Sequence, residues 1–185
     1  MRILGISGSL RSGSQNALLL RAAAELAPEG VEFELYEGLK DIPPYDQDDD
    51  VEPAPTAVAK FRDAISAADV VLIATPEYNS SVPGQLKNAL DWASRPLATN
   101  VLRNKRVAVM GSSAGAFGAV WAQAELRKVA GATGARVLDV EVSVGHAPEK
   151  FDADGRLIDE DVRAALADLV ATIAVPGVTA ALAAA

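Results

Sequence analysis

The sequence contains no cysteine and only one histidine, His146. Without cysteine the chain can form no disulfide, no thiolate nucleophile and no Cys-ligated metal or iron–sulfur centre. A single histidine also leaves no two-histidine metal site within one chain, and we expect His146 to be an ordinary loop residue. Any redox chemistry would therefore depend on a bound organic cofactor.

Positive charge and long hydrophobic runs are also scarce. Lys and Arg number 17 against 25 Asp and Glu, and the net charge of -8 would repel a polyanion, so we expect no nucleic-acid partner. The longest apolar runs are about strand length, whereas a membrane-spanning helix needs roughly 20 residues. We expect a cytoplasmic protein without membrane insertion. The acidic residues from Asp46 to Glu52 lack the spacing of a calcium loop, and we expect no metal site.

Hydrophobic patterns predict five strands that alternate with helices. Three runs are continuously apolar, as in strands buried on both faces: residues 3–6, 70–74 and 107–110. Two segments alternate apolar with acidic residues, which is typical of strands at the margins: residues 31–35 and 138–142. Helical spacing predicts five helices, within residues 18–26, 58–65, 86–93, 117–132 and 162–173.

Right-handed crossovers between these strands give the sheet order 2-1-3-4-5. The sequence thus predicts an α/β fold, a flavodoxin-like three-layer sandwich with a five-stranded parallel sheet. We expect residues 1–175 to form a single domain, because a chain of this length builds one core. Residues 176–185 are rich in Ala, and we expect them to form a C-terminal tail.

The loop after the first predicted strand has the composition of a phosphate-binding turn. Residues 8–16 read Gly-Ser-Leu-Arg-Ser-Gly-Ser-Gln-Asn. Glycines permit a tight turn, the free N–H groups at a helix start attract an anion, and Arg11 can neutralise a phosphate. The loop lacks both the Walker A lysine and the dinucleotide glycine spacing, so a phosphomonoester is predicted rather than a pyrophosphate. The alternative is a plain polar turn capped by Ser14.

Two further loops follow the third and fourth predicted strands. Residues 75–84 contain three features suited to the edge of a heteroaromatic ring: two stiffening prolines, exposed backbone and the flat face of Tyr78. Residues 111–118 are small and would let a ligand approach the backbone closely. The alternatives are a proline-bounded surface turn and a helix cap by Ser112 or Ser113. Because the carboxyl ends of parallel strands share one edge, we expect the three loops to form one crevice.

The motifs in these loops resemble those of the NADPH-dependent FMN reductase family, which includes chromate, quinone and azo-dye reductases with a flavodoxin-like fold. The resemblance runs in order through residues 2–140. The matching segments are Gly-Ser-Leu-Arg-x-x-Ser-x-Asn at 8–16, Pro-Glu-Tyr-Asn at 76–79, Ser-Val-Pro-Gly-x-Leu-Lys-Asn-Ala-x-Asp-Trp at 81–92, and Ser-Ser-x-Gly at 112–115.

This resemblance implies FMN as the cofactor and NADPH or NADH as the electron donor. Carried over position by position, the residues that would hold the FMN phosphate are Ser9, Arg11, Ser14, Gln15 and Asn16. Those that would line the isoalloxazine ring are Pro76, Glu77, Tyr78 and Asn79. Those that would close the pocket are Ser112, Ser113 and Gly115.

The resemblance further implies that two electrons pass by a ping-pong mechanism to a quinone, an azo dye, a flavin or a metal oxyanion such as chromate. No catalytic side chain is expected, because the flavin carries the chemistry. Two alternatives are an electron carrier like flavodoxin and a non-catalytic flavin-binding regulatory module. We also expect a homodimer or homotetramer. Trp92 is expected to pack either in the core or between subunits, and Leu86, Leu90 and Trp92 are candidates for a dimer face.

Overall fold

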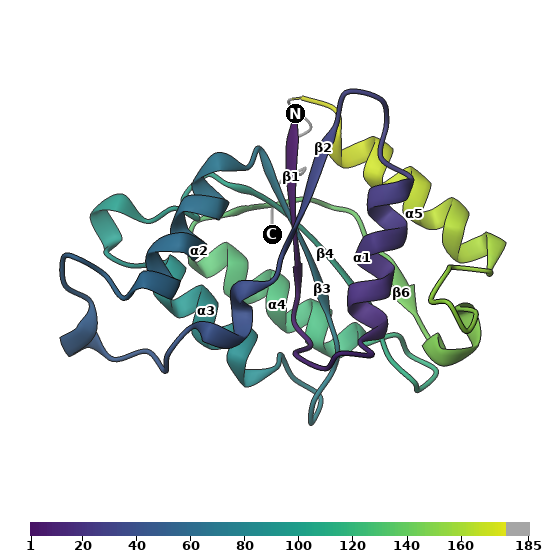
Figure 1. The fold of residues 1–185 in the computed structure, drawn as a ribbon, viewed down its shortest axis with the longest axis horizontal. Coiled ribbons are helices and arrows are strands. Elements are labelled where there is room, and N and C mark those ends of the chain that lie inside the picture. Colours follow the sequence, from purple (N-terminus) through teal and green to yellow (C-terminus); the bar gives the residue numbers. More distant parts are fainter. Residues whose placement is uncertain (177–185) are drawn as a thin grey trace, which may run out of the picture.

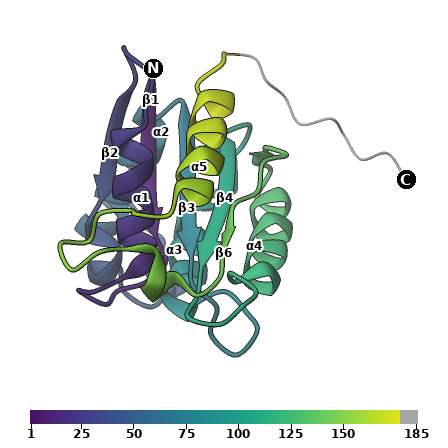
Figure 2. The same cartoon turned by 90° about the vertical axis from the view of Figure 1, so that its right-hand side faces the viewer.

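The computed structural model describes residues 1–176, in which a parallel sheet lies between two layers of helices (Figures 1 and 2). The strands are β1 (Arg2–Ser7), β2 (Glu32–Tyr36), β3 (Val70–Thr75), β4 (Arg106–Ser112), β5 (Arg136–Val137) and β6 (Ser143–Val144). Their order is β2-β1-β3-β4-β5, and β6 also pairs with β4. The predicted flavodoxin-like winding is confirmed. Residues 177–185 of the predicted tail lie outside the described part.

Helices cover both faces of the sheet. One face carries α1 (Gln15–Glu25) and α5 (Glu160–Ile173); the other carries α2 (Thr56–Ala67), α3 (Gly84–Ala93) and α4 (Val120–Ala132). Short 3-10 helices are η1 (Gly38–Asp41), η2 (Gln47–Asp49), η3 (Leu97–Thr99) and η4 (Ala147–Lys150). Helix α4 begins three residues later than residue 117, where we predicted it, because Ala119 has a left-handed φ of 63°. Within residues 1–176, no helix combines the length and apolarity needed to span a membrane.

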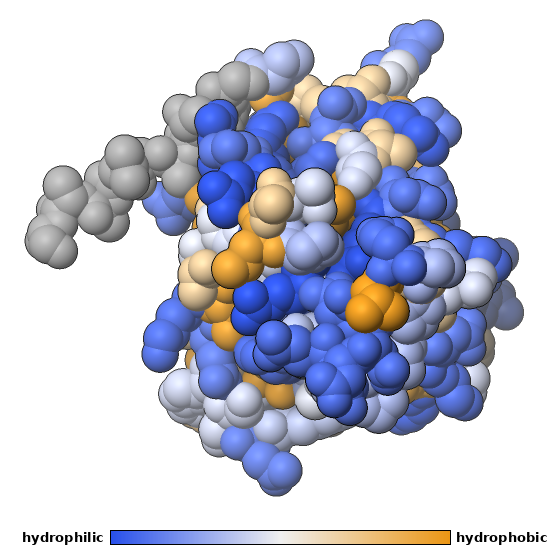
Figure 3. Space-filling view, turned by 90° about the vertical axis from the view of Figure 1, so that its left-hand side faces the viewer, coloured by the Kyte–Doolittle hydropathy of each residue, from blue (hydrophilic) through white to orange (hydrophobic). Residues whose placement is uncertain are grey.

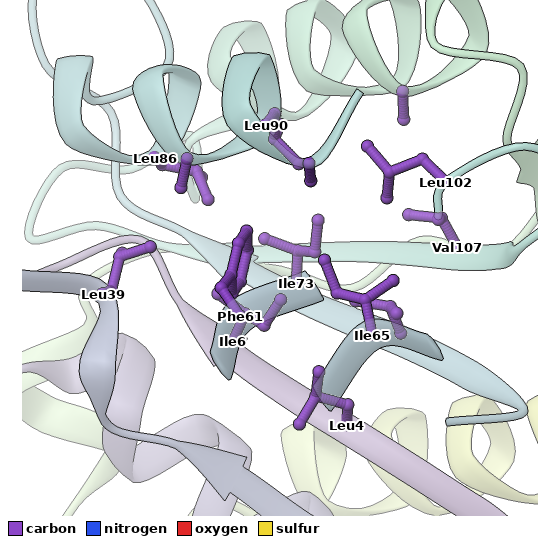
Figure 4. Close-up of a cluster of buried hydrophobic side chains, with 14 of the residues drawn as sticks. Leu4, Ile6, Leu39, Phe61, Ile65, Ile73, Leu86, Leu90, Leu102 and Val107 are labelled. Carbon is purple, nitrogen blue, oxygen red and sulfur yellow. The ribbon is translucent and has the colours of Figure 1, made fainter. Parts of the chain in front are cut away.

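The hydrophobic core lies on both faces of the sheet, and every residue of β3 is buried. On the face of α2 and α3, the side chains of Phe61, Ile73 and Leu86 point into one cluster (Figure 4). Leu86, Leu90 and Trp92 are fully buried within this cluster. Of the two expectations for these residues, core packing is confirmed and the dimer face is wrong, since the apolar side of α3 packs against its own sheet. The outer surface on this side, at the left of Figure 1, is mainly hydrophilic with small apolar patches (Figure 3).

The predicted strand at residues 138–142 is also wrong, because the chain leaves β4 there and divides the strand into β5 and β6. The cause is Arg127 on α4. Its guanidinium donates hydrogen bonds to the carbonyl oxygens of Val109 on β4 (3.3 Å), Leu138 (3.0 Å) and Val140. The side chain thus replaces the strand-to-strand hydrogen bonds that a continuous ladder would make.

We predict that Arg127→Met lowers the free energy of unfolding by about 3 kcal/mol, because three carbonyls lose a charged donor. The matched control is Lys128→Met at the next, exposed position, with an expected change within ~0.5 kcal/mol. Denaturant titration measures both. Equal stability of the two variants would contradict the role of Arg127.

Candidate ligand-binding site

The loops after β1, β3 and β4 meet at the carboxyl edge of the sheet, at the bottom of Figures 1 and 2. Together they line a hollow of ≈ 290 Å³. It includes ten of the twelve predicted site residues: Ser9, Arg11, Ser14, Gln15, Asn16, Pro76, Glu77, Tyr78, Ser112 and Ser113. The remaining two, Asn79 and Gly115, belong to the same loops but do not line the hollow.

The start of α1 forms one wall of the hollow. Ser14 caps the helix, its Oγ accepting a hydrogen bond of 3.1 Å from the amide of Ala17. In residues 1–176, the amides of Gln15 and Asn16 have no acceptor. Free amides at a helix start attract an anion. The sequence left a Ser14 helix cap and an anion site as alternatives for this loop, and the structure shows that the two are compatible.

Asn16 ties the first loop to the third. Its side chain is buried (3% exposed) and pairs with the backbone of Ser112, 96 residues away. The side-chain amide donates to the Ser112 carbonyl oxygen at 3.1 Å, and its oxygen accepts from the Ser112 amide at 3.0 Å. The Asn16 side chain is thus engaged within the protein, and its backbone amide remains available to a ligand.

Glu77 ties the second loop to α4. Its Oε2 accepts hydrogen bonds from the amides of Trp121 (3.1 Å) and Ala122 (3.2 Å). A carboxylate at this position is stabilised by the positive end of the helix dipole, and it satisfies two backbone amides that would otherwise be free. The alternative in which Ser112 or Ser113 caps this helix does not hold, because the helix begins only at Val120.

Tyr78 lies at the mouth of the hollow and is 51% exposed. Its backbone and that of Ser81 exchange two hydrogen bonds of 3.1 Å. Between them, Asn79 and Ser80 both have positive φ values, 52° and 60°, as in the tight turn of a hairpin. This closed turn fixes the position of Tyr78 relative to β3.

Two features of this edge were not predicted from the sequence. Ala114 lines the hollow, although only its position between Ser113 and Gly115 could have indicated it. Phe117 and Trp121 form an edge-to-face pair with ring centroids 5.1 Å apart, and they are 64% and 50% exposed. Exposure of large rings cannot be read from the sequence, because a buried aromatic residue gives the same signal.

The other candidates lie outside this hollow. His146 is exposed at the start of η4, with a left-handed φ of 49°. No group of three or more His, Asp or Glu side chains suited to a metal ion occurs within residues 1–176.

The fold is that of an open α/β sheet in which the strand order runs in opposite directions from β1 and β3. The hollow lies at this switch point, which is where such sheets usually bind ligands. Residues 1–149 match the model of the NADPH-dependent FMN reductase family. The chain belongs to this family. It is therefore an oxidoreductase. The FMN cofactor and the NADPH or NADH donor that the sequence predicts agree with this family.

Individual relatives agree with this family. An NAD(P)H-dependent FMN reductase from Pseudomonas aeruginosa is 46% identical over 164 residues, 88% of either chain. A 2-hydroxy-1,4-benzoquinone reductase from a Burkholderia species is 40% identical over the same coverage. The solved flavoenzyme NAD(P)H:(acceptor) oxidoreductase of Paracoccus denitrificans superimposes with a TM-score of 0.85 and 36% identity, covering 93% of this chain and 94% of that one.

We predict that Asn16→Ala lowers the free energy of unfolding by about 2 kcal/mol, because the buried amide and carbonyl of Ser112 lose their partner. Gln15→Ala, one position earlier on the same helix, serves as the control, with an expected loss below ~0.5 kcal/mol. Thermal or urea unfolding distinguishes the two. A stability of Asn16→Ala equal to that of the control would show that the tie between the loops is dispensable.

Proposed function

We propose that the protein transfers two electrons from NADPH or NADH to a small acceptor, with FMN bound in the hollow, and that quinones are the main acceptor class. The observation that carries this proposal is the single hollow, where a helix N-terminus, Arg11 and the Tyr78 turn are combined. The names of relatives, which include a 2-hydroxy-1,4-benzoquinone reductase and several quinone reductases, support the acceptor class.

The polar end of the hollow fits a phosphate. The hydroxyl of Ser112 is buried and lacks a hydrogen-bond partner, so a ligand oxygen would satisfy it. The free amides of Gln15 and Asn16 and the guanidinium of Arg11 would bind the remaining phosphate oxygens. A side chain at Gly8 would hinder this arrangement, since its Cβ would lie 2.9 Å from the Leu86 side chain beneath the loop.

The rim of the hollow fits a flat ring. Pro76 and Glu77 hold the second loop against the sheet and α4, and Tyr78 presents an aromatic face at the mouth. A volume of ≈ 290 Å³ is at the lower end for ligand pockets, so part of a bound flavin would stay accessible. Such an open ring face suits a ping-pong order, in which the nicotinamide leaves before the acceptor enters.

Bound FMN would supply the hydride-transfer chemistry. The role of the chain is to orient the ring and to place backbone N–H groups where negative charge develops. Glu77 is committed to the helix dipole of α4, which leaves it as a structural anion rather than a general base. On this proposal no side chain of the hollow is catalytic.

Several finer expectations remain proposals of the same kind. Azo dyes, flavins and chromate are further acceptors to be tested beside quinones. A homodimer or homotetramer is expected from the family resemblance, and light scattering during gel filtration measures it. A cytoplasmic location, where NADPH and NADH are available, completes the proposal.

We predict that Arg11→Ala raises the dissociation constant for FMN about tenfold, the loss of roughly one charged hydrogen bond to phosphate. The maximal rate of quinone reduction at saturating FMN should change much less, because Arg11 binds the phosphate and not the reacting ring. Quenching of flavin fluorescence measures binding, and Arg156→Ala, an exposed arginine that does not line the hollow, is the control. Unchanged FMN affinity in Arg11→Ala would refute the phosphate assignment.

A further inference from the structure

A second hollow of ≈ 300 Å³ lies beside the first at the carboxyl edge of the sheet. Its walls come from the loop after β1, the first half of α1, the end of β2 and η1. Ser9 and Arg11 line both hollows, so the loop after β1 is their common wall. Nothing in the proposed flavin site accounts for this second hollow.

Positive charge gathers around the second hollow. Arg11, Arg21 and Lys40 line it together with the carboxylate of Glu37, and Asp41 lies near enough for its charge to act on Tyr36. In the described part of the chain, none of the three cations forms an ion pair with a carboxylate, and the Arg11 guanidinium bonds only to the neutral oxygens of Gly13 and Gln15. In a protein with a net charge of -8, such a local excess of positive charge favours an anionic ligand.

The rest of the lining suits a flat base. Leu20, Leu35 and Leu39 are the apolar side chains of the lining, although Leu20 and Leu39 are nearly buried. Tyr36 also lines the hollow, and its ring packs on Phe61 with centroids 4.9 Å apart. Burial, together with the negative charge of Asp41, raises the pKa of Tyr36. The phenol O–H can donate a hydrogen bond. An apolar floor with unpaired cations at the rim matches a nucleoside that carries a phosphate.

The position of the second hollow relative to the first suggests which nucleoside this is. The first hollow lies over β1, β3 and β4, and the second lies over β1 and β2. From β3 to β2 the distance is two strand spacings, ~10 Å. The adenosine of a nicotinamide dinucleotide is separated from its nicotinamide by two riboses and a pyrophosphate, which is enough to bridge this distance.

We propose that the second hollow binds the 2′-phosphorylated adenosine of NADPH, with Arg21 and Lys40 as the residues that select NADPH over NADH. This proposal rests on the proposed function, in which the nicotinamide reacts in the first hollow. Arg21 and Lys40 line the second hollow and not the first, whereas Arg11 lines both and is unsuitable for a selective test.

A binding experiment tests the proposal without turnover. Isothermal titration of the FMN-loaded protein compares 2′,5′-ADP with 5′-AMP, which differ only in the 2′-phosphate. We expect 2′,5′-ADP to bind about tenfold more tightly, and this preference to disappear in the Arg21→Ala/Lys40→Ala variant. The matched control, Lys60→Ala/Lys128→Ala, removes two exposed cations outside both hollows and should keep the preference. Equal affinity for the two nucleotides in the unchanged protein would overturn the proposal.

Kinetics with a quinone acceptor supply the second test. In the Arg21→Ala/Lys40→Ala variant, kcat/KM for NADPH should fall about tenfold while kcat/KM for NADH stays within about twofold. An equal change for both donors, or no change for either, would overturn the 2′-phosphate site. Those results leave the proposed function intact, since NADH still drives quinone reduction. Failure of both donors to reduce any quinone in the unchanged protein would instead refute the proposed function.

Discussion

The site depends on the reciprocal pair between the Asn16 side chain and the backbone of Ser112. Strand pairing brings β1 and β4 to either side of β3, but it does not determine where the loops beyond them lie. The Asn16 side chain joins the first turn of α1 to the last residue of β4, 96 residues away, and so holds the starts of the adjoining loops together. Because both Ser112 backbone groups are buried, an alternative loop position would leave them without partners. The shape of the hollow follows from this constraint.

The motif residues divide into two groups once their contacts are known. Asn16 and Glu77 have side chains engaged within the protein, one joining the first and third loops and the other joining the second loop to α4. Arg11, Tyr78 and Ser112 line the hollow, and the buried Ser112 hydroxyl has no hydrogen-bond partner within the described residues. A hollow whose walls are tied together in this way is preorganised, so that little ordering remains when a ligand binds.

The sequence predicted the winding and most of the residues that line the hollow, because both depend on local signals. Continuously apolar runs such as residues 70–74 occur in strands covered on both faces, and loops that follow parallel strands share one edge. The strand at residues 138–142 was wrongly predicted because its alternating pattern also fits a segment held by Arg127, a contact made through tertiary structure. The apolar stripe of α3 likewise fits either a core or a dimer face, and only the packing of Trp92 distinguishes them.

The two hollows on either side of Ser9 and Arg11 give this edge of the sheet an asymmetric charge distribution. The first hollow offers amides, hydroxyls and the Arg11 guanidinium, whereas the neighbouring hollow adds Arg21 and Lys40 and shares Arg11 with the first. A cofactor phosphate and an additional donor phosphate would therefore have separate charged partners in Arg11 on one side and in Arg21 and Lys40 on the other. The loop after β1 is the element that both would contact.

The central claim is that the three loops hold the phosphate of FMN at the start of α1, and a crystal structure of the protein with FMN tests it most directly. The account predicts phosphate oxygens within hydrogen-bond distance of the amides of Gln15 and Asn16 and of the Ser112 hydroxyl, with the ring beside Tyr78. A phosphate bound away from the α1 start, or FMN that does not bind the folded protein at all, would contradict it.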